Sequence, residues 1–119
     1  MDCKDLMIGD WCAYGVNCKG RVTALTDHLI TLSVDGNEIN GLYMLMPDMI
    51  RPIPLTEEIL AKNEFVKTWN GDWQFKEYST IIISKDYYVN IFERSIRVDY
   101  VHELQHLLRL CGIEKELTI

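Results

Sequence analysis

Residues 99–112, D-Y-V-H-E-L-Q-H-L-L-R-L-C-G, form the most clearly helical stretch of the sequence. Apolar residues recur in it at intervals of three and four, which is the spacing of one face of an α-helix. This face comprises Tyr100, Val101, Leu104, Leu107, Leu108 and Cys111. We predict an amphipathic helix that packs this face on the core, with Asp99 as its N-terminal cap and Gly112 at its end.

The same stretch contains H-E-L-Q-H at residues 102–106, a literal match to the zinc-protease pattern H-E-x-x-H. Histidines four residues apart on a helix point the same way, and the glutamate between them can act as a general base. The side of the helix opposite the predicted core carries His102, Gln105, His106 and Arg109. Unless another element covers this side, we expect it to be solvated, where water competes for every interaction.

A catalytic zinc ion also needs a third protein ligand. In the longer pattern H-E-x-x-H-x-x-G-x-x-H, Arg109 takes the place of the glycine and Gly112 that of the last histidine. Only 13 residues follow His106, and the carboxylates among them are Glu114 and Glu116. We therefore expect no supporting helix after them.

The remaining histidine, His28, lies in a part of the chain that we predict to be a small β-barrel. We therefore interpret the zinc-protease match as accidental and predict no catalytic, metal-binding or cofactor-binding residue. His102 and His106 are the only candidate metal ligands, and a zinc-dependent hydrolase that uses them is the first alternative function.

Composition and charge narrow the class of protein. The chain has 119 residues, 48% hydrophobic and 25% charged, which fits an ordinary soluble globular protein. Residues 1–54 hold 4 Lys and Arg against 7 Asp and Glu, and residues 55–119 hold 8 against 11, so each part carries −3. Nucleic-acid binding draws much of its affinity from basic residues, so this charge disfavours it.

Targeting signals are not visible in the sequence. No apolar run approaches the roughly 20 residues that span a bilayer, and the first residues, M-D-C-K-D, do not resemble a signal peptide. The four cysteines fit neither a C-x-x-C pair nor a dense disulfide framework, so we expect reduced thiols. We expect a cytoplasmic protein with no membrane partner.

Residues 9–53 alternate short β-prone runs with turn signals. The expected strands are 11–14, 21–25, 28–34, 37–44 and 49–53, and Asp35-Gly36 has the composition of a tight hairpin turn. Pro52 cannot donate a ladder hydrogen bond, which suits an edge strand. Five short strands in so few residues predict an SH3-like β-barrel subdomain over residues 1–54.

The second part, residues 55–119, is predicted to contain a short helix, an antiparallel meander and the C-terminal helix. Thr56 is the expected cap of the short helix, which should end near Asn63. The expected strands are 65–69, 72–78, 80–84, 87–92 and 96–98, with Asn70-Gly71 as a hairpin turn between the first two. Residues 116–119 add one more short strand or simply trail. The predicted fold class is α+β.

Aromatic residues are concentrated in this second sheet. They are Trp69, Trp73, Phe75, Tyr78, Tyr87, Tyr88 and Phe92, with Lys67, Lys76, Lys85, Arg94 and Arg97 interleaved. Aromatic sheets with interleaved cations bind single-stranded nucleic acid by stacking, which makes a nucleic-acid-binding module the second alternative function. We favour the other explanation, in which these rings form the core beneath the C-terminal helix.

Two resemblances to known families rest on short motifs. Gly9-Asp10 followed by Gly20-Arg21-Val22 resembles the opening of KOW-type barrels of translation and transcription proteins. P-I-P-L-T-E-E-I-L at 52–60 and Y-V-H-E-L-Q-H-L at 100–107 resemble a family of small uncharacterised proteins of Bacteroides-type gut bacteria, their prophages and mobile elements. That family often has Gln in place of Glu103 and Asn in place of His106. The second resemblance implies a fold and a genomic setting but no mechanism.

From these observations we expect a non-enzymatic protein-interaction or accessory factor of a prophage or mobile element. Its partner is an unidentified protein or a second copy of the chain. The environment of His102 and His106 distinguishes this expectation from the zinc hydrolase, and binding of single-stranded oligonucleotides distinguishes it from the nucleic-acid module.

Overall fold

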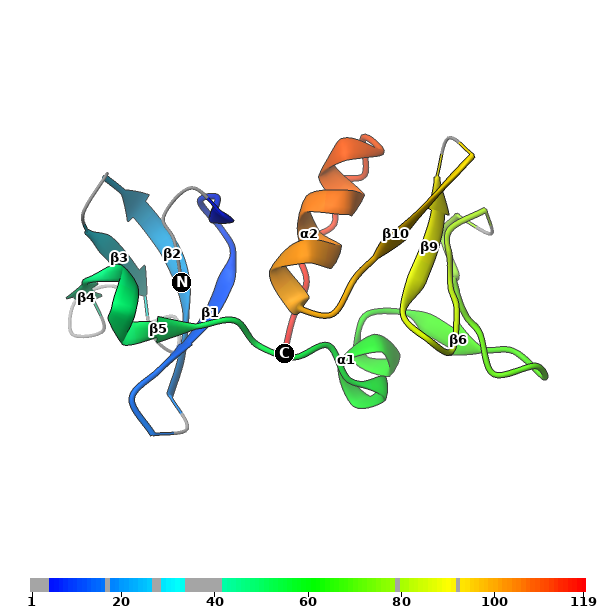
Figure 1. Ribbon diagram of the computed structural model, residues 1–119, viewed down its shortest axis with the longest axis horizontal. Helices are drawn as coiled ribbons and strands as arrows, with labels where there is room; N and C mark the ends of the chain where they lie inside the picture. The colour runs from blue at the N-terminus through cyan, green and yellow to red at the C-terminus, as the bar shows by residue number, and fades with distance from the viewer. Residues whose placement is uncertain (1–4, 17, 27–28, 34–41, 79, 92) are drawn as a thin grey trace.

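The computed structural model describes residues 5–16, 18–26, 29–33, 42–78, 80–91 and 93–119. The molecule measures 43 × 25 × 24 Å, and its described residues form two five-stranded antiparallel sheets and two α-helices. Helix α2 stands between the two sheets, as Figure 1 shows. The predicted α+β class is therefore confirmed.

The first sheet curls into a half-barrel. It contains β1 (Trp11–Tyr14), β2 (Cys18–Leu25), β3 (Ile30–Ser33), β4 (Leu42–Leu45) and β5 (Ile50–Arg51) in the order β4-β3-β2-β1-β5. A 3₁₀ turn, Pro47–Met49, leads into β5, which pairs with β1. A shift of register between Val22 and Ala24 interrupts the β2–β3 ladder, and such bulges bend a sheet. The predicted turn at Asp35-Gly36 lies outside the described residues.

The second sheet is the predicted antiparallel meander. Its strands are β6 (Phe65–Lys67), β7 (Trp73–Phe75), β8 (Ile82–Ile83), β9 (Tyr88–Ile91) and β10 (Arg94–Arg97), in the order β10-β9-β8-β7-β6. Helices α1 (Glu57–Lys62) and α2 (Val101–Leu110) complete this part of the chain. The final residues 116–119 form no strand but pack Leu117 into the core.

Two clusters of buried apolar side chains lie one in each part. The smaller contains Leu6, Cys12, Val22, Ile30, Leu32 and Ile50. The larger draws on residues 53–117, including Phe75, Leu104 and Leu108, and Trp11 and Ala13 of β1 pack against it. Strand β1 therefore takes part in both.

The β6–β7 hairpin has a wider turn than the two-residue one that Asn70-Gly71 predicts. Thr68 N–H donates to Asp72 O and Gly71 N–H to Thr68 O, so the loop has three residues, Trp69 to Gly71. Gly71 has φ +93°, the left-handed conformation that a three-residue hairpin loop places at its last position. The Asn-Gly pair thus marks the hairpin correctly but serves as the end of a type I turn rather than as a type I′ turn.

The helix ends were predicted with mixed success. Thr56 Oγ1 accepts from Ile59 N–H, as expected of a cap, and Gly112 ends α2 with φ +77°. The expected Asp99 cap is wrong, because the N-cap position is Tyr100. Instead, Glu103 Oε1 accepts the backbone N–H groups of both Asp99 and Tyr100 at 3.1 Å.

The predicted solvated side of α2 is also wrong. His102 is 7% exposed and Gln105 is 2% exposed, so the helix is buried on two sides. The reason is that the second sheet covers one side, while β1 and the chain after Gly112 cover the other (Figure 1). Gln105 is held by Lys115 O and by Leu117 N–H, at 2.8 and 2.9 Å. Sequence periodicity finds one buried face and has no means to find a second that a remote segment covers.

Neither helix formed by the described residues has the length and hydrophobicity of a membrane-spanning segment.

Candidate functional site

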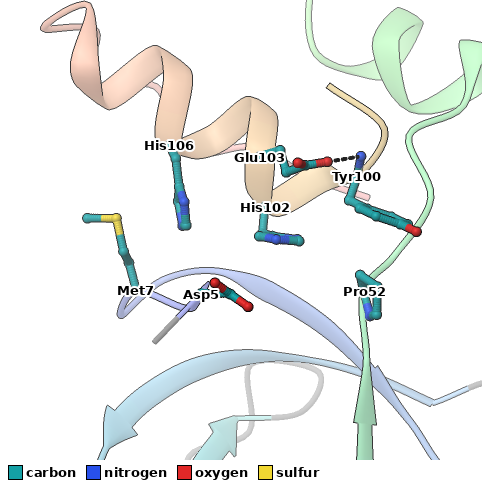
Figure 2. Close-up of a pocket in the computed structure, with 7 residues that line it drawn as sticks. All are labelled: Asp5, Met7, Pro52, Tyr100, His102, Glu103 and His106. Carbon is teal, nitrogen blue, oxygen red and sulfur yellow. Dashed lines mark hydrogen bonds between the residues drawn. The ribbon is translucent and has the colours of Figure 1, made fainter. Parts of the chain in front are cut away.

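A cleft of about 600 Å³ opens between the start of α2 and the N-terminal segment of the chain. Its lining residues are Asp5, Met7, Pro52, Tyr100, His102, Glu103 and His106. Figure 2 shows both histidines pointing from α2 into the cleft, on the side where Asp5 lies. The structure thus gathers the three chemically distinctive residues of H-E-L-Q-H at one cleft and adds a carboxylate that sequence reasoning missed.

His102 is the most buried polar group of the cleft. Its ring lies nearly parallel to that of Tyr100, with centroids 5.9 Å apart, and meets the His106 ring edge-on at 5.6 Å. Its Nδ1 has no hydrogen-bond partner among the described residues. Burial lowers the pKa of His102 below 6.5, against the opposing attraction of Asp10. The imidazole is therefore neutral at pH 7.

His106 makes a different contact, with Asp10, the residue that directly precedes β1. Its Nε2 donates to Asp10 Oδ2 over 2.6 Å, and Arg109 Nη1 lies 3.4 Å from Asp10 Oδ1. Met7 N–H donates to the same Oδ2 at 2.7 Å. Asp10 itself is 0% exposed, so its carboxylate is satisfied entirely by protein groups. These contacts tie α2 to the first part of the chain.

Glu103 is turned away from the cleft interior. Its Oε1 accepts from the backbone of Asp99 and Tyr100 at the start of α2, and Figure 2 shows the bond to Tyr100. A general base must reach a water molecule held beside a metal ion. The carboxylate of Glu103 instead stabilises the end of the helix, where a negative charge is favoured by the helix dipole.

The described residues bring together two histidines but no third metal ligand beside them. His102 Nδ1 has no hydrogen-bond partner among the described residues, so it is a free ring nitrogen. His106 Nε2 is directed to Asp10. In the part of the chain that the structure describes, no group of three or more His, Cys, Asp or Glu side chains is arranged to hold a metal ion.

The other acidic candidates for a third ligand lie elsewhere. Glu116 pairs with Arg21 of β2 and lies 3.9 Å from Arg109 Nη2, while Glu114 is exposed. His28 lies outside the described residues. None of these carboxylates lines the cleft that holds His102 and His106.

The contacts around Asp10 continue into a polar interface between the two parts of the chain. Trp11 Nε1 donates to Leu117 O at 2.8 Å, and the Arg21 guanidinium lies 5.4 Å from the centre of the Trp11 ring. Gly9 has φ +93°, and a Cβ there would lie 2.8 Å from Arg109 Nη2. The left-handed backbone explains why glycine precedes Asp10.

The aromatic group of the second sheet divides between core and surface. Trp73 and Phe75 are buried beneath α2, as the core interpretation predicts. Trp69, Tyr78 and Tyr88 are exposed, and Trp69 is 97% exposed at the tip of the β6–β7 hairpin. Phe92 lies outside the described residues. Trp73 and Phe75 therefore belong to the core, whereas Trp69, Tyr78 and Tyr88 are available for contacts at the surface.

The outer face of the second sheet carries further apolar side chains. The register pairs Val66 with Gln74 and Gln74 with Ile82, so these three residues share a face. Val66 and Ile82 are exposed, as is Tyr88 on the neighbouring strand. Helix α2 covers the opposite face, where Phe65, Trp73, Phe75 and Ile83 are buried.

Comparison of the chain with protein-family models, with curated proteins and with solved structures gave no significant match.

Proposed function

We propose that the protein is a non-enzymatic interaction module that binds a partner protein, or a second copy of itself, through Trp69 and the outer face of the second sheet. The observation that carries this proposal is the exposure of Trp69. Tryptophan is among the largest apolar side chains and is enriched where one protein anchors another. At 97% exposure, its ring gains nothing from the fold that presents it.

The setting of Trp69 supports this role. The hairpin tip is held by the Thr68–Asp72 and Gly71–Thr68 backbone hydrogen bonds, and Asn70 Oδ1 accepts from Asp72 N–H. Figure 1 shows this hairpin projecting from the end of the molecule that lies furthest from the first sheet. A side chain on a fixed backbone loses less conformational freedom when it binds.

Val66, Ile82 and Tyr88 extend the exposed apolar surface beyond the tip. All three are at least 40% exposed on or beside the uncovered face of the sheet. Contiguous exposed apolar residues rimmed by polar ones are typical of protein–protein contacts. Gln74 lies between Val66 and Ile82 on this face, so the surface combines apolar side chains with one amide.

The two alternative functions have less support. Glu103 and His106 of the zinc pattern already make structural contacts, and two of the rings required for a stacking platform are buried. Arg97, whose guanidinium lies 5.4 Å from the centre of the Tyr88 ring, is already paired with Asp99 and is less available to a phosphate group. An interaction module is therefore the function that the described residues favour.

Three finer parts of the proposal concern fold and setting. In the first sheet, β1 to β4 form a meander, and β5 then pairs with β1 after a 3₁₀ turn. This strand order supports an SH3-like barrel for residues 1–54. The resemblance of residues 52–60 and 100–107 to the Bacteroides-type family supports an accessory role in a prophage or mobile element. A cytoplasmic location is part of the same proposal.

The test compares three purified baits: the unmodified protein, Trp69→Ala and Val16→Ala. Val16 is an exposed apolar residue of the first sheet's β1–β2 turn and serves as the matched control. Sedimentation equilibrium measures self-association, and calorimetry measures affinity for any protein retained from an extract. We expect Trp69→Ala to weaken the interaction about thirtyfold, the effect of losing a hot-spot residue worth about 2 kcal/mol.

Val16→Ala should change the affinity by less than about twofold, as expected of an apolar residue outside the interface. Equal binding by the Trp69→Ala variant would show that the interface lies elsewhere. A protein that neither self-associates nor retains a partner would contradict the proposal as a whole.

A further inference from the structure

A second cavity, of about 560 Å³, lies between the first sheet and α1, beside residues 52–54, which join the two parts of the chain. Its apolar lining consists of Ala13, Pro52, Ile53, Pro54, Ile59 and Ile119. Cations border it from three elements: Lys19 of β2, Arg51 of β5 and Lys62 of α1. We propose that this cavity is a binding site for a small organic carboxylate that carries an apolar chain.

The charges around the cavity have the opposite sign to that of the protein. The whole chain carries −6, yet three basic side chains meet here against one carboxylate, Glu58. Glu58 is already paired with Lys62, whose Nζ lies 3.6 Å from its Oε1. Lys19 and Arg51 are thus left with positive charge that no described carboxylate neutralises, and a monoanion would complement it.

Arg51 is the group best placed to fix the anion. Its Nη2 donates to Gly15 O at 2.8 Å, which holds the guanidinium in place. The remaining donors have no partner among the described residues. A guanidinium edge matches the two oxygens of a carboxylate, and such paired charge-assisted bonds are stronger than neutral hydrogen bonds.

The floor of the cavity determines the rest of the ligand. Ile53 and Ile59 are buried, and the flanking Pro52 and Pro54 provide no backbone N–H that a polar ligand could use. Small-molecule sites have volumes of roughly 300–1,000 Å³, are mostly apolar and carry few polar groups that orient the ligand. This cavity lies in that range of volumes and is mostly apolar, and its polar lining consists of Lys19, Arg51 and Lys62 beside Thr56 and Glu58.

Octanoate is a suitable probe, because it joins a carboxylate to a short apolar chain. A titration of the full chain by ¹H–¹⁵N NMR should show saturable shifts at residues 13, 19, 51 and 59, with a Kd of about 1 mM for a ligand of this size. Octanol and octylammonium should bind at least about tenfold more weakly, because they lack the negative charge.

Variants identify the groups responsible. Lys19→Gln and Arg51→Gln should each weaken octanoate binding about tenfold, whereas Lys76→Gln, which removes an exposed lysine of the second part, should leave it within about twofold. Arg51→Lys keeps the positive charge but loses the pair of parallel N–H donors, so we expect an affinity for octanoate between those of the unmodified protein and Arg51→Gln. Unchanged amide shifts far from the cavity establish that each variant is folded.

Several results would overturn the proposal. They are the absence of saturable shifts, equal affinity for octanol or octylammonium, equal affinity in the Lys19 and Arg51 variants, and shifts confined to the outer face of the second sheet. Binding of an acidic peptide without binding of octanoate would also overturn it, because the site would then belong to a protein partner. Except for shifts on the outer face of the second sheet, these results concern the cavity alone, because the Trp69 interface is a separate surface.

Discussion

Removal of the Asp10 carboxylate should destabilise the protein more than any change to an exposed acidic residue. Asp10 is fully buried and receives hydrogen bonds from Met7 N–H and His106 Nε2, with Arg109 Nη1 at 3.4 Å. Breaking a buried charge pair by removing one partner costs about 3–5 kcal/mol, because the other charge is left unpaired. The side chains of His106 and Arg109 keep 29% and 23% exposure, so water compensates part of this loss.

We therefore expect Asp10→Ala to lower the free energy of unfolding by about 3 kcal/mol, a large fraction of the roughly 5–15 kcal/mol of an ordinary domain. Urea titrations followed by tryptophan fluorescence measure this loss. The signal includes Trp11, whose indole donates to Leu117 O across the same interface. Glu114→Ala, which removes an exposed carboxylate, should change stability by less than about 0.5 kcal/mol.

A double-mutant cycle with His106→Ala isolates the pair from other effects of the substitutions. Residues in direct contact show coupling energies of about 0.5–3 kcal/mol, and the 2.6 Å contact between His106 and a fully buried carboxylate should lie in the upper half of that range. A coupling near zero, or an Asp10→Ala loss below about 1 kcal/mol, would refute the claim that Asp10 joins the two parts of the chain.

Two further predictions concern other buried polar groups. Burial lowers the pKa of His102 below 6.5, its value in the unfolded chain. As the pH falls below about 6.5, the unfolded chain therefore binds a proton before the folded chain does, and the free energy of unfolding decreases. We expect His102→Gln to lose less stability than the unmodified protein between pH 7 and pH 5 in urea titrations, and parallel curves would contradict this. Asn63→Ala should cost about 2–3 kcal/mol in thermal unfolding, since Asn63 Nδ2 donates to Ile59 O and Thr118 O at 2.8 and 2.7 Å. Exposed Asn90→Ala should cost under about 0.5 kcal/mol, and equal losses for the two variants would count against the role of Asn63.

Local features were predictable from the sequence because their causes lie within a few residues. The Thr56 cap lies next to the helix that it starts, and Gly112 directly follows the helix that it ends. The second sheet's strand order follows from short hairpin connections between successive β-prone runs. These features depend on backbone preferences and on side chains that meet their neighbours along the chain.

The candidate site was predictable only in part. The sequence placed His102 and His106 on one side of a helix, and both point into the same cleft. It did not indicate that Asp5 lines that cleft, or that His106 meets Asp10, 96 positions earlier in the chain. The pair Gly9-Asp10 is typical of a turn, and the residues around it do not predict that Asp10 is completely buried.

The sequence by itself determined the α+β class, the meander, the cap of α1 and most of the apolar face of α2. The prediction of Tyr100 and Cys111 on that face is wrong, because they flank the helix and are exposed. Only the tertiary structure decided that α2 has a second buried side. It also decided that Glu103 stabilises the start of the helix and that His106 contacts Asp10 of the other part of the chain. It also decided that Trp69 is exposed while Trp73 is buried, four residues along the same hairpin. The physical reason is that periodicity records how a residue is oriented on its own element, whereas burial depends on which distant element packs against it.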